Sequence, residues 1–216
     1  MVDLITDLDP GRVSANLSRI AAELAGAGRA PGEVEILAAV KYVPVDQLQA
    51  LADAGVKLLG ENRAQDLVAK AAAYPGRFTW DFIGRLQSRK VKTIIPCVRY
   101  IHSVDSDSVL AQLERHARPD TRVLVEVNIA GETGKGGVRP EDVPAFIDRC
   151  PVPVAGLMTM PPATGDPEAS RPWFAALREL AERHGLEQLS MGTSQDYVVA
   201  AQEGATIVRI GTSLYR

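Results

Sequence analysis

Short apolar runs alternate with longer segments of helical spacing along almost the whole chain. The runs are rich in Val and Ile and occupy residues 36–40, 56–59, 80–83, 100–102, 123–129, 154–158, 188–191 and 206–210. Between them, helical spacing occupies residues 45–54, 64–73, 87–95, 108–117, 140–149, 168–184 and 194–204. This alternation is typical of parallel strands that are joined by crossover helices.

Eight such runs in 216 residues predict an α/β fold, a single (β/α)8 barrel of the TIM type. An open doubly wound sheet is the alternative, but the runs show no break at their midpoint. Apolar residues at helical spacing also occur in residues 13–24, and the chain ends directly after the last run. We therefore expect an N-terminal helix in place of the last outer helix, and one domain over residues 1–216.

The composition argues against several classes of partner. A net charge of −3 and a pI near 5.7 disfavour nucleic acid and anionic membranes, which bind to basic surfaces. Residues 1–4 do not resemble the start of a signal peptide, and no apolar run could cross a bilayer, so we expect a cytoplasmic protein. Cys97, Cys150 and the three histidines lack metal-ligand spacing, so we expect no metal site.

Lys41 directly follows the first apolar run. In a barrel of this type, the residues at the carboxyl ends of the strands form the active face. A lysine that points into the barrel mouth loses contact with water, which lowers the pKa of its ammonium group and leaves a nucleophilic amine. Such an amine is suited to forming an imine with an aldehyde. The alternative is an ordinary surface lysine at the end of a strand.

The loops after the last two runs resemble an anion site. Met191 and Ser194 lie in the loop after the seventh run, where Ser194 is expected to cap the next helix, and Gly211 and Thr212 follow the eighth. Small residues with hydroxyl groups, beside backbone N–H groups, bind phosphate at this position of many barrels. Because the last strands neighbour the first in a closed barrel, we expect Lys41 and these loops to share one mouth. This combination indicates a phosphorylated aldehyde as the ligand.

Two further polar residues belong to the predicted mouth. Arg209 alternates with Gly211 on the eighth run, so its guanidinium is expected inside the barrel, near the phosphate loops. Pairing with a buried carboxylate such as Glu126 is the alternative role for this arginine. Asn62 follows the second run and either lines the mouth or caps the helix predicted at residues 64–73.

The chain resembles the pyridoxal-phosphate homeostasis protein family, which shares the barrel of the N-terminal domain of alanine racemase. The resemblance covers almost the whole sequence. It is carried by Ala39-Val40-Lys41, Gly60-Glu61-Asn62, Phe82-Ile83-Gly84 with Leu86-Gln87, Gly156-Leu157-Met158, Ser190-Met191-Gly192 with Ser194, and Arg209-Ile210-Gly211-Thr212.

The resemblance implies that pyridoxal 5′-phosphate (PLP) is the cofactor and that Lys41 holds it as a Schiff base. It also implies that Ser194, Gly211 and Thr212 bind the phosphate and that Arg209 faces the pyridine nitrogen. The sequence departs from the family pattern at three places. Asp81 stands where His is usual, Arg89 stands where Asn is usual, and Tyr42-Val43 replaces a commoner Thr-Lys.

The family relationship predicts a protein of intracellular PLP homeostasis without catalytic turnover, with PLP-dependent apoenzymes as recipients. A PLP-dependent amino-acid racemase is the alternative. That reaction requires a base on each face of the bound substrate, and the opposing tyrosine of the racemases belongs to an extra domain. Without that domain we expect a monomer and no racemase activity. A Schiff-base aldolase, in which Lys41 would attack a sugar phosphate directly, is the third hypothesis.

Overall fold

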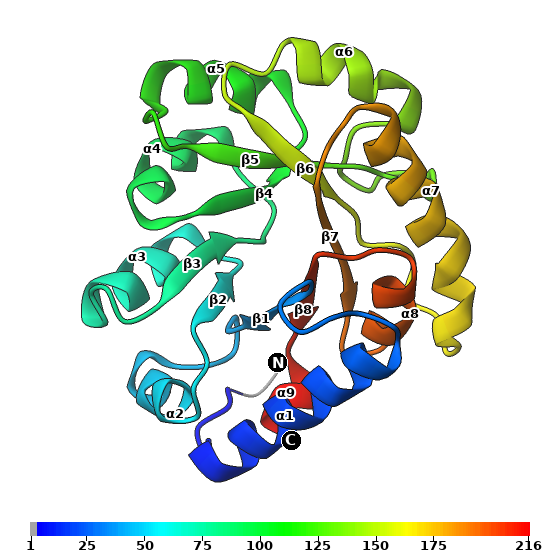
Figure 1. Ribbon diagram of the computed structural model, residues 1–216. Coiled ribbons are helices and arrows are strands. Elements are labelled where there is room, and N and C mark those ends of the chain that lie inside the picture. Colours follow the sequence, from blue (N-terminus) through cyan, green and yellow to red (C-terminus); the bar gives the residue numbers. More distant parts are fainter. Residues whose placement is uncertain (1–3) are drawn as a thin grey trace.

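The computed structural model describes residues 4–216 and contains a closed parallel barrel (Figure 1). Its strands follow one another in chain order, and β8 pairs with β1 to close the barrel. The predicted (β/α)8 fold is therefore confirmed. Residues 1–3 lie outside the described residues. The expected domain over residues 1–216 and the interpretation of residues 1–4 as no signal peptide also included them. The strands are β1 (Glu35–Ala39), β2 (Leu58–Glu61), β3 (Thr79–Phe82), β4 (Tyr100–Val104), β5 (Arg122–Glu126), β6 (Val154–Met158), β7 (Gln188–Thr193) and β8 (Ile207–Ile210).

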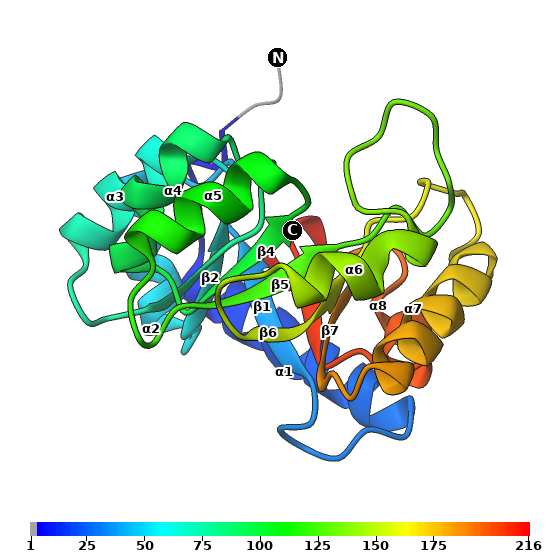
Figure 2. The ribbon, with the colours of Figure 1, turned by 90° about the horizontal axis from the view of Figure 1, so that it is seen from above.

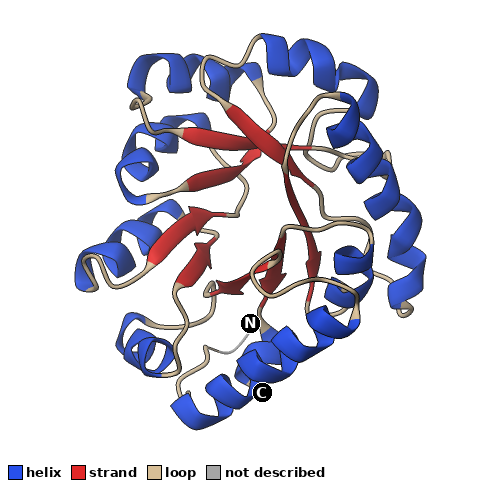
Figure 3. Ribbon diagram, viewed as in Figure 1, coloured by secondary structure: helices blue, strands red, loops and turns tan. Residues whose placement is uncertain are grey.

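Helices surround the strands on the outside of the barrel (Figure 3). The α-helices within residues 4–216 are α1 (Pro10–Gly26), α2 (Leu48–Asp53), α3 (Ala64–Ala73), α4 (Val91–Ile94), α5 (Asp107–His116), α6 (Val143–Asp148), α7 (Arg171–Arg183), α8 (Tyr197–Gln202) and α9 (Thr212–Tyr215). Short 3-10 turns are η1 (Val45–Gln47), η2 (Ser88–Lys90), η3 (Ile95–Cys97), η4 (Pro140–Asp142) and η5 (Pro167–Ser170). Several predicted helices therefore begin with a 3-10 turn, which is common at helix N-termini.

The apolar run at residues 123–129 is a strand only as far as Glu126. Beyond it, the side-chain oxygen of Asn128 accepts a hydrogen bond from the backbone N–H of Glu132, 3.0 Å away, and this contact turns the chain into a loop. The loop extends away from the barrel before it returns to η4, and it is green in Figure 2. The sequence pattern alone did not reveal this turn.

The closing face of the barrel differs in part from the prediction. Helix α1 lies there as expected, with Val13, Ile20 and Leu24 buried, but β8 is followed by the short helix α9 (Figure 1). The two helices lie side by side, and the side-chain amide of Asn16 in α1 donates to the carbonyl of Leu214 in α9 at 3.2 Å. The expectation that no helix follows the eighth strand was wrong, since the last residues are sufficient for one helical turn.

Two hydrophobic layers determine which side chains reach the barrel mouth. The larger layer lies between the strands and the helices, and a smaller one fills the barrel interior. The interior layer consists of Leu37, Leu58, Ile83, Leu124, Met158 and Ile207. Because side chains alternate along a strand, Leu37 inside the barrel places Ala39, the last residue of β1, on the same side. The same alternation from Ile207 places Arg209 inside.

A buried ion pair joins helix α3 to the ends of β1 and β2. The ammonium group of Lys70 lies 2.5 Å from the carboxylate of Glu61, and both side chains are almost fully buried. The same ammonium donates to the backbone carbonyl of Val40 at 2.7 Å. The other oxygen of Glu61 accepts from the backbone N–H of Asn62 and of Arg63. These contacts fix the loops from which the barrel mouth is built.

We predict that Lys70→Met destabilises the protein by about 3–5 kcal/mol, because removing one partner leaves the Glu61 carboxylate buried without a counter-charge. Urea unfolding of the variant and the wild type measures this difference. Lys57→Met is the matched control, since Lys57 is exposed. A Lys70→Met variant within about 0.5 kcal/mol of the wild type, the range of ordinary surface substitutions, would show that the pair does not stabilise the fold.

Candidate functional site

Lys41 lies two residues beyond the carboxyl end of β1, in the turn that leads out of the strand. Its side chain is half-buried, and its amine lies 4.9 Å from the centre of the Tyr42 ring. Within residues 4–216, no hydrogen bond or ion pair engages this amine. The amine is therefore free to react with a ligand.

Two side chains hold the backbone that carries Lys41. The hydroxyl group of Tyr215 donates to the carbonyl of Ala39 at 3.1 Å, and Lys70 donates to the carbonyl of Val40. Because both carbonyls precede Lys41 directly, the position of its Cα is fixed from two directions. Sequence reasoning missed both residues: Lys70 lies in a predicted helix, and Tyr215 lies beyond the last apolar run.

A cavity of about 330 Å³ opens beside Lys41, within the volume range of small-molecule sites. Four of the predicted site residues line it, together with segments near both ends of the described chain. The lining residues are Ile5, Ala39, Lys41, Tyr42, Asn62, Gly211, Thr212, Tyr215 and Arg216. Asn62 therefore lies at the mouth. The alternative cap role for Asn62 is wrong, because Arg63 occupies the cap position of α3.

The loops after β7 and β8 are joined through the hydroxyl group of Ser194. Its oxygen accepts hydrogen bonds from the backbone N–H of Gly211 at 3.1 Å and of Ser213 at 3.3 Å. The prediction that Ser194 caps the next helix was wrong, because α8 begins only at Tyr197 and Asp196 occupies its cap position. Two backbone N–H groups thus converge on one oxygen beside the cavity. This is an arrangement in which an anionic oxygen can also be bound.

Met191 does not belong to the cavity. Its side chain is fully buried in the larger hydrophobic layer, which also contains Val199 and Ala200 of α8. The next residue, Gly192, has a φ of +89°, and a Cβ atom there would lie 2.6 Å from the Cβ of Ala200. Only glycine permits this turn and this close approach of α8. The predicted cofactor contact of Met191 is therefore not supported for its side chain.

Arg209 is buried inside the barrel, with 6% of its surface exposed. Its guanidinium donates from Nη1 to the backbone carbonyl of Ser190 at 2.7 Å and to its hydroxyl oxygen at 2.6 Å. Nη2 donates to the carbonyl of Thr159 at 2.8 Å. Burial lowers the pKa of Arg209 to about 10, so the group stays protonated at neutral pH. Among the described residues no carboxylate lies within ion-pair distance of Arg209, although the nearby charge of Glu126 partly offsets the lowering of its pKa.

Ser190 and Thr159 were not among the predicted site residues. Strand alternation could have indicated Ser190, since it lies four residues before Ser194, an even spacing that favours the same face of the strand. Thr159 offered no such signal, because its contribution is a backbone carbonyl.

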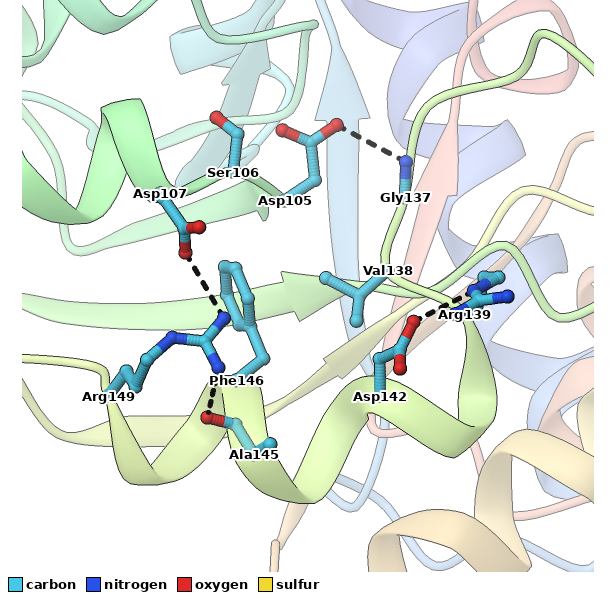
Figure 4. Close-up of a pocket in the computed structure, with 10 residues that line it drawn as sticks. All are labelled: Asp105, Ser106, Asp107, Gly137, Val138, Arg139, Asp142, Ala145, Phe146 and Arg149. Carbon is cyan, nitrogen blue, oxygen red and sulfur yellow. Dashed lines mark hydrogen bonds and ion pairs between the residues drawn. The ribbon is translucent and has the colours of Figure 1, made fainter.

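A second cavity, of about 470 Å³, lies between the start of α5 and helix α6 (Figure 4). Its arginines are already paired: Arg149 lies 3.1 Å from Asp107, and Arg139 lies 2.8 Å from Asp142. None of its lining residues is a predicted site residue. The cavity beside Lys41 is therefore the stronger candidate.

Residues 4–216 also bear on metal binding and on membrane insertion. No cluster of three His, Cys, Asp or Glu side chains in this part of the chain is arranged to hold a metal ion. None of the helices described is both long and apolar enough to cross a membrane.

Comparison with known proteins agrees with this geometry. Residues 8–216 match the family described as "Alanine racemase, N-terminal domain". A protein of Aquifex aeolicus named "Pyridoxal phosphate homeostasis protein" is 41% identical, with 94% of this chain and 96% of the relative covered. A protein of the same name from Pseudomonas aeruginosa is 36% identical, with 94% of each chain covered.

A solved structure of PipY from Synechococcus elongatus, described as having PLP bound, is also similar. It superposes with a TM-score of 0.78 at 27% identity and covers 94% of this chain and 100% of its own. From the barrel, the cavity beside Lys41 and these relatives, we conclude that the chain belongs to the alanine racemase N-terminal domain family and, within it, to the pyridoxal phosphate homeostasis proteins.

Proposed function

We propose that this protein binds PLP in the cavity beside Lys41 and takes part in PLP homeostasis, as the names of its relatives indicate. One observation carries the proposal: Lys41 and Gly211 line the same cavity, and Ser194 gathers the N–H groups of Gly211 and Ser213 beside it. The buried guanidinium of Arg209 lies on β8, the strand that leads to Gly211. The PLP bound to the similar PipY supports the same ligand class.

The chemistry of these groups fits PLP. When bound, PLP supplies an aldehyde carbon that can form an imine with an amine, and Lys41 is the amine of this cavity. The hydroxyl hydrogen of Ser194 can rotate toward a phosphate oxygen while its oxygen accepts from Gly211 and Ser213. A change of the Ser194 rotamer would move that oxygen away and free the two N–H groups for the same phosphate. Thr212 and Asn62, which also line the cavity, can add further polar contacts.

Arg209 argues for a carrier and against carbanion chemistry. A protonated guanidinium near the pyridine nitrogen disfavours protonation of that nitrogen. An unprotonated ring withdraws electrons poorly, so it stabilises a carbanion poorly. The buried contacts with Ser190 and Thr159 hold the cation in place at neutral pH.

Tyr215 is unsuited to serve as a second base. Its hydroxyl hydrogen is engaged by the carbonyl of Ala39. Burial, reinforced by the charge of Glu61, raises the pKa of Tyr215 well above its ordinary value, so the phenol stays protonated. The function without turnover is therefore the better supported one. Delivery of PLP to apoenzymes and the monomeric state remain predictions.

To test PLP binding, we would incubate the purified protein with PLP, remove free ligand by gel filtration and record the visible absorbance. The wild type is expected to retain a visible band, because Lys41 binds the aldehyde covalently. Borohydride reduction should then fix PLP on the peptide that contains Lys41, as mass spectrometry would detect. Lys41→Ala should lose both signals, and Lys57→Ala, at an exposed lysine, should keep them. A colourless wild type would refute the proposal.

A second prediction concerns the phosphate. Ser194→Ala should raise the dissociation constant for PLP by about 10- to 100-fold, since hydrogen bonds to charged groups contribute about 1.5–3 kcal/mol. Its effect on pyridoxal, which lacks the phosphate, should be less than about twofold. Titration of both ligands by absorbance measures this difference, with Ser14→Ala on the exposed face of α1 as the control. Equal effects on both ligands would remove Ser194 from the phosphate site.

A third prediction separates the carrier from the racemase. With PLP bound and L-alanine in excess, the protein should form no D-alanine above the background of Lys41→Ala, because the phenol of Tyr215 stays protonated and donates to Ala39. Chiral chromatography of the reaction over several hours provides the measurement. Sustained formation of D-alanine over many turnovers would favour the enzyme.

A further inference from the structure

A chain of buried polar groups crosses the barrel interior behind Arg209. The hydroxyl oxygen of Ser190, which accepts from Arg209, lies 2.9 Å from Nδ1 of His102. The other ring nitrogen of His102, Nε2, lies 3.1 Å from the carboxylate of Asp81. Ser190, His102 and Asp81 are fully buried, and they come from β7, β4 and β3. The chain therefore links Arg209 to the opposite side of the barrel.

Asp81 is surrounded by donors. Arg99 donates to both carboxylate oxygens, from Nε at 3.1 Å and from Nη2 at 2.7 Å. The backbone N–H of Tyr100 donates to the same carboxylate at 3.1 Å. Although burial opposes ionisation, the hydrogen bonds from His102 and Arg99, together with the charge of Arg99, outweigh it and lower the pKa of Asp81. Asp81 is therefore a carboxylate, and it can only accept hydrogen bonds.

This fixes the direction of every hydrogen bond in the chain. Since Asp81 can only accept, Nε2 of His102 must carry the hydrogen. Burial lowers the pKa of His102, so the ring is neutral at pH 7 and its Nδ1 has a lone pair. Ser190 then donates its hydrogen to Nδ1, and its oxygen accepts from Arg209.

We propose that Asp81 is a positioning residue for Arg209: acting through His102 and Ser190, it sets one direction of hydrogen bonding that holds the guanidinium in place for the ring nitrogen of PLP. The last part of this inference rests on the proposed function. Asp81 stands where a histidine is usual in the family that the sequence resembles. A histidine at this place could either donate or accept, whereas a carboxylate leaves a single arrangement.

The first experiment needs no ligand and is read on the wild-type protein. Nitrogen-15 NMR of the imidazole groups in the wild-type protein at pH 7.5 reports which ring nitrogen carries the hydrogen. His102 should be neutral and protonated at Nε2 alone. A His102 ring protonated at Nδ1, or at both nitrogens, would overturn the inference. His102→Gln, which removes the signal, assigns it.

The second experiment uses Asp81→Asn, whose amide can donate as well as accept. The His102 signals of this variant should shift toward a mixture of the two neutral forms, and the dissociation constant for PLP should rise about 3- to 10-fold. Asp53→Asn, at an exposed position of α2, is the matched control. If Asp81→Asn binds PLP like the wild type with an unchanged His102, the inference fails.

The two levels of the proposal can fail separately. A wild type that shows the expected His102 form but does not bind PLP refutes the proposed function and leaves the hydrogen-bond direction intact. A wild type that binds PLP but has His102 in the other form refutes the inference alone.

If Asp81→Asn does not fold, Ser190→Ala replaces it. Removing the Ser190 hydroxyl group should weaken PLP binding by a similar factor without changing the ion pair between Asp81 and Arg99. Unaltered binding by Ser190→Ala would contradict the inference.

Discussion

Pairing of the first strand with the last is the contact on which the site depends. β1 and β8 run parallel in a register that places Leu37 opposite Arg209 and Ala38 opposite Ile210. The loops that follow the two strands, with Lys41 on one and Gly211 on the other, are thereby neighbours although 170 residues separate them in the sequence. An open sheet of the same elements would leave these loops at opposite edges.

Periodicity predicted the fold because the two hydrophobic layers impose it on the sequence. Every strand must bury one face against helices and the other in the barrel, so short Val- and Ile-rich runs recur. The same alternation was enough to place Arg209 inside the barrel. The end of the first apolar run placed Lys41 just beyond β1, where it lines the cavity.

Other features depend on contacts between distant residues, which spacing does not reveal. Ser194 lies three residues before a helix, a position that suggests a cap, but the turn at Gly192 directs its hydroxyl toward the next loop. Met191 belongs to a motif of the mouth, yet its side chain points to the opposite face of β7. The partners of Asp81 come from another strand and another loop, so its role could be found only once the barrel was closed.

The bond between Ser194 and its two N–H donors has a consequence for a protein that must both take up and release a small molecule. In the free protein, the hydroxyl group satisfies the two backbone donors, so emptying the pocket leaves no exposed strain or unpaired amide behind. A phosphate could reach these two N–H groups only after the Ser194 oxygen left them, which would subtract from the affinity and bring the filled and empty states closer in free energy. A pocket whose backbone N–H groups are already hydrogen-bonded when it is empty favours exchange of its ligand over permanent retention.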